Sequence, residues 1–416
     1  MSSPASRDRR VKIMGSERPL RVAILHPDLG LGGAERLIVD AALELQRRGH
    51  RVTIFTGSHD PARAFDETRD GTLDVRVRGG WLPLHVGGRL RVAAAIAKMT
   101  AGALAILRDA DQPDIVISDV VPHVIPLFRA LRRRLPVLFY CHFPDQLLTP
   151  PRRGLYAWYR APFDALEAAG TARASTVLVN SQYTADVFAR TYPDLHVSPQ
   201  VVYPGVDVAR WAPQPGASGA RTTIVSVARF ERAKNAQLAI AAFARLREML
   251  PPDAFAPLRL AMAGGFDARL SECVDTRDAL RRLARARDLQ DRVDFLPSCP
   301  EPDLRALIAG SLAVVYTPEH EHFGYVPVEA MACARPVVAA ASGGPLETIV
   351  DGETGFLVAP TADAFAGAMA RLVADPALAD RMGGAGRARV MSLFSRAAFG
   401  ARLEAAVRAG AGRADR

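Results

Sequence analysis

Residues 21–55 read RVAILHPDLGLGGAERLIVDAALELQRRGHRVTIF, and this stretch decides the fold class. The apolar, partly β-branched residues 21–26 are typical of a buried strand, and a loop with three glycines follows them. Apolar residues then recur at helical spacing over residues 34–48, and Gly49 is suited to end that helix. A second strand is predicted at residues 51–55. Strand, helix and strand in this order predict a βαβ unit with parallel strands.

The same alternation of strands and helices continues to the end of the chain. A stretch rich in proline and glycine at residues 204–219 separates two such series, so we place a domain junction there. The pattern predicts an α/β protein of two doubly wound, Rossmann-like domains, with ligands bound at the carboxyl ends of the strands. Beyond the two strands above, the predicted strands are residues 115–118, 136–140, 176–180, 222–228, 258–263, 293–296, 313–317 and 336–340.

The use of basic residues in this chain is unusual. Only Lys12, Lys98 and Lys234 are lysines among the 53 basic residues, so arginine has replaced lysine almost everywhere. The lysine at position 234 therefore indicates a place where a compact ammonium group is needed. The net charge of +9 does not predict nucleic-acid binding, because no basic stripe with interleaved aromatic residues occurs in the sequence.

The cysteines and the apolar segments exclude some further classes. Four scattered cysteines form no CxxC pair, so neither a zinc site nor a disulfide framework is predicted. Residues 92–107 are mostly small and apolar, but with Lys98 among them they are short for a transmembrane span. We predict a core helix there, and a helix that lies on a bilayer is the alternative.

The loop HPDLGLGGAER at residues 26–36 lies between the first strand and the first helix. Glycines let a ligand approach the backbone closely, and a helix N-terminus offers free N–H groups to an anion. Gly32 and Gly33 are therefore candidate ligand contacts. An ordinary tight turn explains these glycines equally well, and their spacing is not the GxGxxG of a dinucleotide site.

A second motif, SVARFERAKN at residues 226–235, follows the first strand of the second domain. We expect a helix to begin near Asn235, which is a good N-cap residue. Arg229 and Lys234 would then converge with a helix N-terminus on one point. That arrangement suits a diphosphate and would stabilise the charge of a departing nucleotide. The alternative is a solvated basic turn.

Two glutamates stand out in a third motif, YTPEHEHFGYVPVEAM at residues 316–331. Glu321 is expected in a loop, and Glu329 is expected early in a helix that begins near Pro327. Because their backbone settings differ, we expect the two carboxylates to hold different parts of one ligand and not to act as an acid–base pair. The alternative is one capping carboxylate and one surface carboxylate.

A fourth motif, SGGPLE at residues 342–347, is another glycine turn between a strand and a helix. Gly343 and Gly344 make it a second candidate phosphate cradle. Close packing of the backbone is the alternative reason for two glycines here.

Together these motifs resemble those of the retaining glycosyltransferases of the GT4 family, which have the GT-B fold of two Rossmann-like domains facing across a cleft. The resemblance runs from about residue 20 to about residue 400. Within this family the combination looks like the α-1,3/α-1,6-mannosyltransferases of the dolichol pathway. The further stretches that carry this likeness are FYCHFPD (139–145), LVNSQYTADVF (178–188), EHFGYVPVEAM (321–331) and SGGPLETIVDGETGF (342–356).

The resemblance implies a role for each candidate residue. Glu329 would bind the ribose hydroxyls of the nucleotide, and Glu321 would contact the transferred sugar near the reacting centre. Arg229 and Lys234 would hold the diphosphate as leaving group. Lys234 would do so alone on its side, because Ala233 stands where the family usually has another lysine. Further donor contacts are implied at Gly32, Gly33, Phe323, Gly324, Gly343 and Gly344.

The resemblance also points to His142, which follows a predicted strand. This residue would be a catalytic contact to the sugar, with Asp145 nearby. A histidine that only completes the core after a strand is an equal alternative.

Residues 1–19 are basic and show no apolar periodicity, so they are expected to form a disordered tail. The resemblance divides the rest of the chain into functional parts. Residues 20–205 would be an acceptor-binding domain, and residues 206–390 a nucleotide-sugar-binding domain. Residues 391–416 are expected to form a C-terminal helix that packs back on the N-terminal domain and frays at its end.

The implied reaction adds α-1,3- and then α-1,6-linked mannose from GDP-mannose to Man-GlcNAc2-PP-dolichol, in the synthesis of lipid-linked oligosaccharide for N-glycosylation. The departing phosphate would help to deprotonate the incoming hydroxyl, while the protein positions the reactants and stabilises charge. No cofactor and no essential divalent metal are expected, because no Asp-X-Asp motif follows a strand. The alternatives are a GT4 enzyme with another donor or acceptor, a nucleotide-sugar epimerase, and a non-catalytic binding protein.

A lipid-linked acceptor implies contact with a membrane. The implied location is the cytoplasmic face of the endoplasmic reticulum membrane, with peripheral or monotopic contact and a complex with other early dolichol-pathway transferases. Candidates for the membrane face are the predicted helix at residues 92–107 and the basic residues Arg129, Arg132, Arg133 and Arg134. A solvated basic helix end is the alternative.

Overall fold

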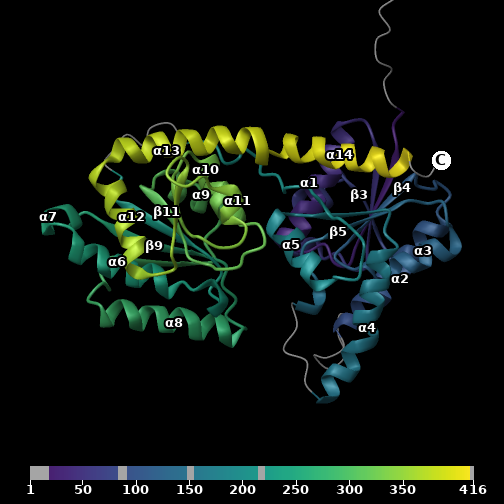
Figure 1. Cartoon of the computed structure of the whole chain (residues 1–416), viewed down its shortest axis with the longest axis horizontal. Coiled ribbons are helices and arrows are strands. Elements are labelled where there is room, and N and C mark those ends of the chain that lie inside the picture. The colour runs from purple at the N-terminus through teal and green to yellow at the C-terminus, as the bar shows by residue number, and fades with distance from the viewer. Residues whose placement is uncertain (1–17, 83–90, 148–153, 214–220, 413–416) are drawn as a thin grey trace, which may run out of the picture.

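The computed structural model describes residues 18–82, 91–147, 154–213 and 221–412. Two α/β domains lie side by side, and the last two long helices run along one edge of both domains (Figure 1). Almost all of the basic tail expected at residues 1–19 lies outside the described residues.

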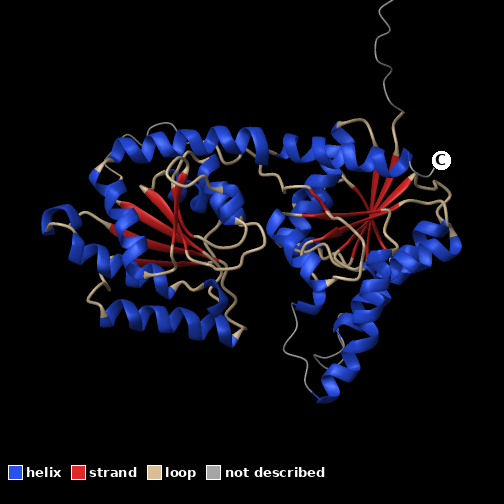
Figure 2. Ribbon diagram, in the orientation of Figure 1, coloured by secondary structure: helices blue, strands red, loops and turns tan. Residues whose placement is uncertain are grey.

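The N-terminal domain is built on a parallel sheet with helices on both of its faces (Figure 2). The strand order is β3-β2-β1-β4-β5-β6-β7, so the chain reverses its direction of winding between β1 and β4. The strands are β1 Arg21–His26, β2 Arg51–Thr56, β3 Asp74–Val77, β4 Ile115–Asp119, β5 Val137–Cys141, β6 Thr176–Val179 and β7 Gln200–Val201. The helices are α1 Gly33–Arg47, α2 Arg91–Arg108, α3 Ile125–Leu131, α4 Gly154–Ala172 and α5 Gln182–Thr191.

The C-terminal domain repeats this architecture with a second parallel sheet, in the order β10-β9-β8-β11-β12-β13. Its strands are β8 Thr223–Val227, β9 Arg259–Gly264, β10 Val293–Pro297, β11 Ala313–Tyr316, β12 Val337–Ala340 and β13 Gly355–Val358. Its helices are α6 Gln237–Met249, α7 Pro252–Phe255, α8 Ser271–Ala286, α9 Glu301–Ala309, α10 Tyr325–Ala332, α11 Pro345–Thr348, α12 Ala362–Ala374 and α13 Pro376–Arg389.

The central strands are buried along nearly their whole length, which explains their continuous apolar sequences. All residues of β4 and β5 are buried, and so are all residues of β11 and β12. Such strands need cover on both faces, and only a parallel sheet between two helical layers gives it. The core therefore fixes the carboxyl ends of these strands, where the polar loops begin.

The chain crosses between the domains twice, and the two crossings are bonded to each other. The N–H of Val206 donates to the carbonyl of Phe394 (2.8 Å), and the N–H of Arg396 donates to the carbonyl of Val206 (2.9 Å). After the second crossing, helix α14 (Arg396–Gly412) lies against α1 and joins the core of the N-terminal domain. Its buried contacts are Phe399, Leu403, Ala406 and Val407.

The expected helix start at Asn235 is wrong. Residues 232–234 form a short 3₁₀ turn, Asn235 adopts a left-handed conformation with a φ of 49°, and α6 begins at Gln237. The hydroxyl of Thr317 donates to the carbonyl of Lys234 (2.9 Å) and fixes this turn from the neighbouring strand end. Asparagine tolerates the left-handed region better than most residues do, so it ends the turn here.

The apolar segment at residues 92–107 is a core helix, which was the favoured interpretation. Helix α2 packs on the sheet through Met99, Ala103 and Ile106, and its lysine, Lys98, is buried and bonded to the hydroxyl of Ser58. Within the described ranges, no helix combines the length and the apolar character needed to cross a bilayer.

Candidate functional site

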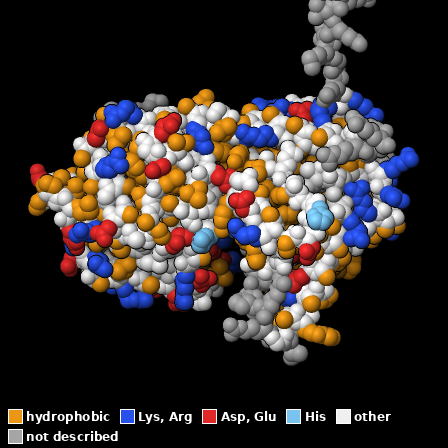
Figure 3. Space-filling model, in the orientation of Figure 1, with side chains coloured by type: hydrophobic (Ala, Val, Ile, Leu, Met, Phe, Trp, Pro, Cys, Tyr) orange, Lys and Arg blue, Asp and Glu red, His pale blue; other side chains and the backbone are white. Residues whose placement is uncertain are grey.

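A cleft of about 880 Å³ separates the two domains, and both contribute to its walls. Figure 3 shows it as a hollow at the boundary between the two halves of the molecule. The N-terminal domain contributes the start of α1 and His142, which follows β5. The C-terminal domain contributes the loop after β8 and the segment that joins β11 to α10. The carboxyl ends of both sheets therefore meet at one cavity.

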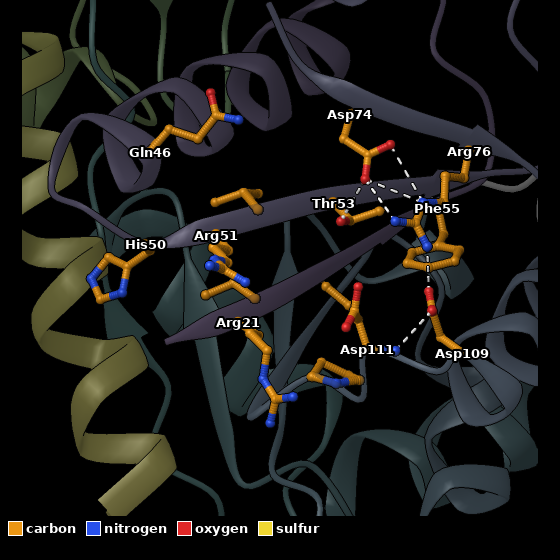
Figure 4. Close-up of a pocket in the computed structure, with 14 residues that line it drawn as sticks. Arg21, Gln46, His50, Arg51, Thr53, Phe55, Asp74, Arg76, Asp109 and Asp111 are labelled. Atoms are coloured by element: carbon orange, nitrogen blue, oxygen red, sulfur yellow. Dashed lines mark hydrogen bonds and ion pairs between the residues drawn. The ribbon is translucent and has the colours of Figure 1, made fainter. Parts of the chain in front are cut away.

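A second hollow, of about 380 Å³, lies at the opposite edge of the N-terminal sheet (Figure 4). It is lined by the first residues of β1, β2 and β3, and its charges neutralise one another. Arg76 pairs with Asp74 (3.0 Å) and with Asp109 (2.5 Å). This edge carries the amino ends of parallel strands, where ligands seldom bind in such folds, so the interdomain cleft is the candidate site.

Lys234 and Glu321 meet on the C-terminal wall of the cleft. The Lys234 ammonium forms an ion pair with the Glu321 carboxylate, which also accepts a hydrogen bond from the buried Tyr316 hydroxyl. Burial, together with the charge of Glu321, raises the pKa of Tyr316 well above its usual value, so this hydroxyl stays a donor. Glu321 is thus held on two sides, and it holds the lysine at the cleft.

Arg229 lies on the same wall but is far more exposed. Its side chain keeps 68% of its accessible surface, and its guanidinium pairs with Glu231 at 3.2 Å. An exposed arginine of this kind can turn toward an anion at small cost. The structure therefore brings Arg229 and Lys234 to one cavity, with the lysine deeper and better fixed.

Glu329 projects into the cleft from α10. Burial raises the pKa of its carboxyl to about 7, and the negative charge of Glu301 contributes to the increase. Within the described part of the chain, no hydrogen bond or ion pair reaches this carboxylate. A half-buried carboxyl at the cleft wall, without a partner among the described residues, favours a ligand that donates hydrogen bonds to it.

The expectation that Glu329 binds the ribose hydroxyls of a nucleotide predicts that nucleotide binding depends on pH through this carboxyl. Two hydroxyl donors would stabilise the ionised form, so binding should strengthen as the pH rises from 6 to 8 and weaken by up to about tenfold per unit below pH 7. Calorimetric titration with GDP across this range measures the effect. Glu329→Gln should bind more weakly and show no such pH dependence. A pH-independent affinity in the unmodified protein would contradict the assignment.

The structure places Gly343 and Gly344 behind the Glu321 loop, and neither residue lines the cleft. A Cβ atom on Gly344 would lie 2.3 Å from the carbonyl oxygen of Phe323, and one on Gly343 would lie 2.4 Å from that of Glu321. The N–H of Gly344 donates to the carbonyl of Glu321 (2.7 Å). This N–H is therefore not open to a phosphate, and both glycines pack closely against the Glu321 loop.

The other predicted glycines do lie at the cleft. Gly32 caps the start of α1, and Gly33 faces the ring of Tyr325 across the domain boundary. Gly324 is the N-cap of α10 and has a φ of 84°, a conformation that favours glycine. Phe323 is buried just before it and also borders the cleft.

His142 belongs to a buried cluster that the sequence did not reveal. Its Nε2 lies 2.9 Å from Oδ1 of Asp119, and the other oxygen of Asp119 lies 2.7 Å from Nδ1 of His26. Both His26 and Asp119 are buried, whereas His142 borders the cleft. Despite the cost of burial, its two histidine partners lower the pKa of Asp119 to about 2, so the carboxylate stays ionised. The pKa of His26 is raised because the attraction of Asp119 outweighs burial.

Asp145 points away from this cluster. Its carboxylate pairs with Arg160 of α4 at 2.6 Å and does not line the cleft. Asp145, expected near His142, therefore does not bond to its ring, and Asp119 does. The missed signal was the position of Asp119 at the end of a buried strand next to β1 and β5, since the carboxyl ends of neighbouring parallel strands converge.

Two of the quoted motifs meet across the domain boundary. The Glu347 carboxylate accepts hydrogen bonds from the backbone N–H groups of Gln182 and Tyr183 (2.7 Å each) and from the Tyr203 hydroxyl (3.0 Å). It thereby caps helix α5 of the other domain, where a negative charge is favoured.

Residues beside the cleft add a second contact of this kind. The rings of Phe143 and His322 stack with centroids 3.8 Å apart, and Ser181 donates to the carbonyl of His322 (2.5 Å). Burial lowers the pKa of His322 to about 4, so this ring is neutral at physiological pH. These contacts fix the relative position of the two cleft walls.

Removing the Glu347 contact should loosen the two domains. Glu347→Ala should cost about 1–3 kcal/mol, because it leaves helix N–H groups without their charged acceptor. Small-angle scattering should show a larger radius of gyration, and thermal unfolding should begin at a lower temperature. Glu353→Ala, an exposed control, should change neither. An unchanged radius with an unchanged melting curve would contradict this role.

Comparisons with known proteins agree with this architecture. The model "Glycosyltransferase Family 4" matches residues 31–210, and "Glycosyl transferases group 1" matches residues 207–389. Alpha-1,3/1,6-mannosyltransferase ALG2 of Mus musculus is 43% identical over 393 residues, 92% of this chain and 94% of that protein. The Homo sapiens protein of that name is 43% identical over 389 residues, 91% and 93% of the two chains.

Solved structures confirm the predicted fold. Sucrose-phosphate synthase from Thermosynechococcus elongatus superposes with a TM-score of 0.75 at 23% identity, covering 94% of this chain and 98% of that one. Anabaena HepE in complex with UDP and glucose gives a TM-score of 0.69 at 20% identity, covering 94% and 100%. At these identities the likeness establishes the pair of Rossmann-like domains and nothing more specific.

Proposed function

Since this chain belongs to the family 4 glycosyltransferases and, within them, to the alpha-1,3/1,6-mannosyltransferase ALG2 family, we propose that its interdomain cleft transfers mannose from GDP-mannose to a lipid-linked oligosaccharide. The predicted class of enzyme, a glycosyltransferase, is confirmed by the family. One observation supports the proposal for the site. The ion pair of Lys234 and Glu321 lies in the same cleft as the carboxyl of Glu329, which has no partner among the described residues.

We assign the donor to the C-terminal wall. Glu329 would accept hydrogen bonds from the two ribose hydroxyls, which suits a carboxyl that otherwise lacks a partner. Lys234 and Arg229 would hold the diphosphate, and Glu321 would fix the lysine and contact the mannose. Gly32, Gly33, Phe323 and Gly324 would border the donor, since all four line the same cleft.

The proposed reaction proceeds with retention at the anomeric carbon. The bond from this carbon to the diphosphate oxygen breaks while the acceptor hydroxyl attacks from the same face, and the departing phosphate oxygen takes up the hydroxyl proton. Negative charge grows on the diphosphate, where Lys234 and Arg229 stabilise it. We propose that these two cations do the work of a divalent metal, so chelators should leave the activity unchanged.

We assign the acceptor to the N-terminal wall. His142 would contact the sugar, because it lines the cleft and its ring is held in place by a hydrogen bond to the buried Asp119 carboxylate. The proposed acceptor is Man-GlcNAc2-PP-dolichol, to which α-1,3-linked and then α-1,6-linked mannose is added. The proposed setting is the cytoplasmic face of the endoplasmic reticulum membrane, with peripheral contact and with other early transferases of the dolichol pathway as partners.

Direct transfer tests this proposal. The protein is incubated with GDP-mannose and a Man-GlcNAc2 diphospholipid, with and without EDTA, and mass spectrometry counts the mannoses added. Two additions, unchanged by EDTA, are expected, and Glu329→Gln should weaken the reaction mainly through the apparent affinity for GDP-mannose. Transfer from UDP-sugars with none from GDP-mannose would overturn the assignment of the donor.

A further inference from the structure

Helix α4 exposes an apolar stripe to solvent. Its outward residues recur at helical spacing and carry no charge, which is the pattern of a side that is normally buried. Trp158, near the start of the helix, keeps 86% of its accessible surface. The exposed members of the stripe are Trp158, Ala161, Pro162, Ala165 and Leu166, and Tyr156 is exposed beside them.

The charged residues of α4 lie on its opposite side, which faces the protein. An ordinary surface helix has the reverse arrangement, with its apolar side toward the core and its charged side toward solvent. Arg160 is only 1% exposed and pairs with Asp145 (2.6 Å) and with Asp164 (3.0 Å). Glu167 is also buried and accepts a hydrogen bond from the N–H of Asp145 (2.8 Å). These bonds fix the rotation of the helix, and the apolar stripe must therefore face outward.

The helix stands away from the body of the domain. Figure 1 shows α4 projecting from the N-terminal half, and Figure 3 shows hydrophobic side chains toward its far end. At about 1.5 Å per residue, the helix is about 28 Å long. A projecting apolar stripe of this length costs free energy in water, so it indicates a surface that becomes covered.

A cluster of cations at the other end of α4 indicates what covers the stripe. Arg173 directly follows the helix, at the end of the apolar side, and it is exposed. Arg129 donates to the carbonyls of Arg173 (2.9 Å) and Arg133 (3.2 Å) and so joins the ends of α3 and α4. The exposed cations gathered there are Arg132, Arg133, Arg134 and Arg173. An uncharged apolar stripe that ends in arginines complements the apolar interior and anionic headgroups of a lipid bilayer.

We infer that helix α4 docks this protein on an anionic lipid surface, with Trp158 and Leu166 entering the interfacial region and the arginine cluster on the headgroups. Tryptophan and tyrosine side chains prefer this depth because their rings are apolar and their polar atoms stay hydrated. Docking through α4 would hold the N-terminal wall of the cleft near the membrane. This inference rests on the proposed function, because a lipid-linked acceptor requires contact with a membrane. It assigns that contact to α4 and not to the helix at residues 92–107, which lies in the core.

Vesicle binding without any sugar substrate tests this docking, so its outcome is independent of the donor and the reaction. The full chain is sedimented with vesicles of phosphatidylcholine and phosphatidylserine, and with phosphatidylcholine alone. Trp158→Glu combined with Leu166→Glu should weaken binding to the mixed vesicles by at least about tenfold. Arg133→Gln with Arg134→Gln should weaken it by about fivefold per arginine and should matter only when the anionic lipid is present.

A matched control and a depth measurement make the test specific to α4. Trp81 is equally exposed (84%) but belongs to the loop after β3, so Trp81→Glu should leave binding unchanged. Brominated lipid should quench the tryptophan fluorescence of the unmodified protein, and Trp158→Phe should remove most of the quenching. GDP affinity and the melting curve should stay unchanged in every variant, which excludes misfolding as the cause.

Three results would overturn the inference. Equal loss of binding on Trp81→Glu would show that exposed tryptophans act without regard to α4. Unaltered binding of the Trp158→Glu, Leu166→Glu variant would show that another surface docks. A vesicle-free dimer that this variant abolishes would show that a second copy of the chain covers the stripe.

Discussion

Lys234→Ala should lower kcat by roughly 100- to 1,000-fold, while the affinity for GDP falls by less than about tenfold. The diphosphate gains negative charge as its bond to the sugar breaks, so the ammonium acts more strongly on the transition state than on the bound donor. The loss of activity should exceed that caused by removing a cation without an acidic partner. Without Lys234, the Glu321 carboxylate would lie beside the departing group with no cation to balance its charge. A negative charge placed there would oppose the growth of negative charge on the departing diphosphate.

Steady-state kinetics with varied GDP-mannose, together with calorimetric GDP binding, separate these two effects. Arg232→Ala is the matched control, because Arg232 belongs to the same turn but is exposed and does not line the cleft. Lys234→Arg tests whether charge suffices, and it should recover only part of the activity, since a planar guanidinium cannot replace a compact ammonium in the pair with Glu321. Activity of Lys234→Ala within a few fold of the unmodified enzyme would contradict the role.

Asp119→Asn should lower kcat by roughly 10- to 100-fold, although Asp119 itself is buried beneath His142. The carboxylate accepts from both histidines, at 2.7 and 2.9 Å, and so selects the tautomer in which His142 keeps its proton on Nε2. The other ring nitrogen, Nδ1, is then free to accept a hydrogen bond. An asparagine of nearly equal volume presents an N–H₂ group to one histidine, so that ring must change its tautomer or turn away.

The pH dependence of activity and stability distinguishes a role of Asp119 in positioning His142 from a simple loss of structure in the variant. Asp119 remains ionised down to about pH 2 and raises the pKa of His26. Its negative charge should stabilise the fold above its unfolded pKa near 4, and this contribution is lost as the pH falls toward 2. His26 has the opposite sign: its raised pKa stabilises the fold at low pH, and that contribution is lost as the pH rises through the folded value.

Asp119→Asn should therefore move the acidic limb of the pH–rate profile to lower pH, because His26 loses the negative charge that raises its pKa. His26→Gln should keep a hydrogen bond to Asp119 and lose less activity, since His142 is still oriented. An Asp119→Asn enzyme with reduced kcat and an unshifted pH profile would indicate a structural defect alone.

Much of the fold follows from local patterns in the sequence. The buried strands stand out because parallel strands covered on both faces need continuous apolar residues, and helices of period 3.6 separate them. The loops after β1, β8 and β11 could be found in the same way, and the structure places Arg229, Lys234, Glu321, Glu329 and His142 at one cleft. Their roles there remain predictions until the variants above are measured.

The motif around Gly343 shows where local reasoning fails. A glycine pair between a strand and a helix indicates a phosphate cradle as readily as a close backbone contact. Only the distance to the Glu321 and Phe323 carbonyls distinguishes them, and that distance depends on another loop. Asn235 is a similar case, because a hydroxyl from the end of β11 decides whether it caps a helix or ends a turn.

The sequence by itself therefore determined the two domains, ten of the thirteen strands that the structure describes and most of the polar residues at the strand ends, because these depend on neighbours along the chain. The tertiary structure alone decided which of those residues meet. Asp119 lies 93 positions from His26 yet bonds to it, since β1 and β4 are adjacent in the sheet. Glu347 caps a helix of the other domain, and the rotation of α4 is set by Asp145. Contacts between distant segments depend on how the layers pack, and no periodicity along the chain records that packing.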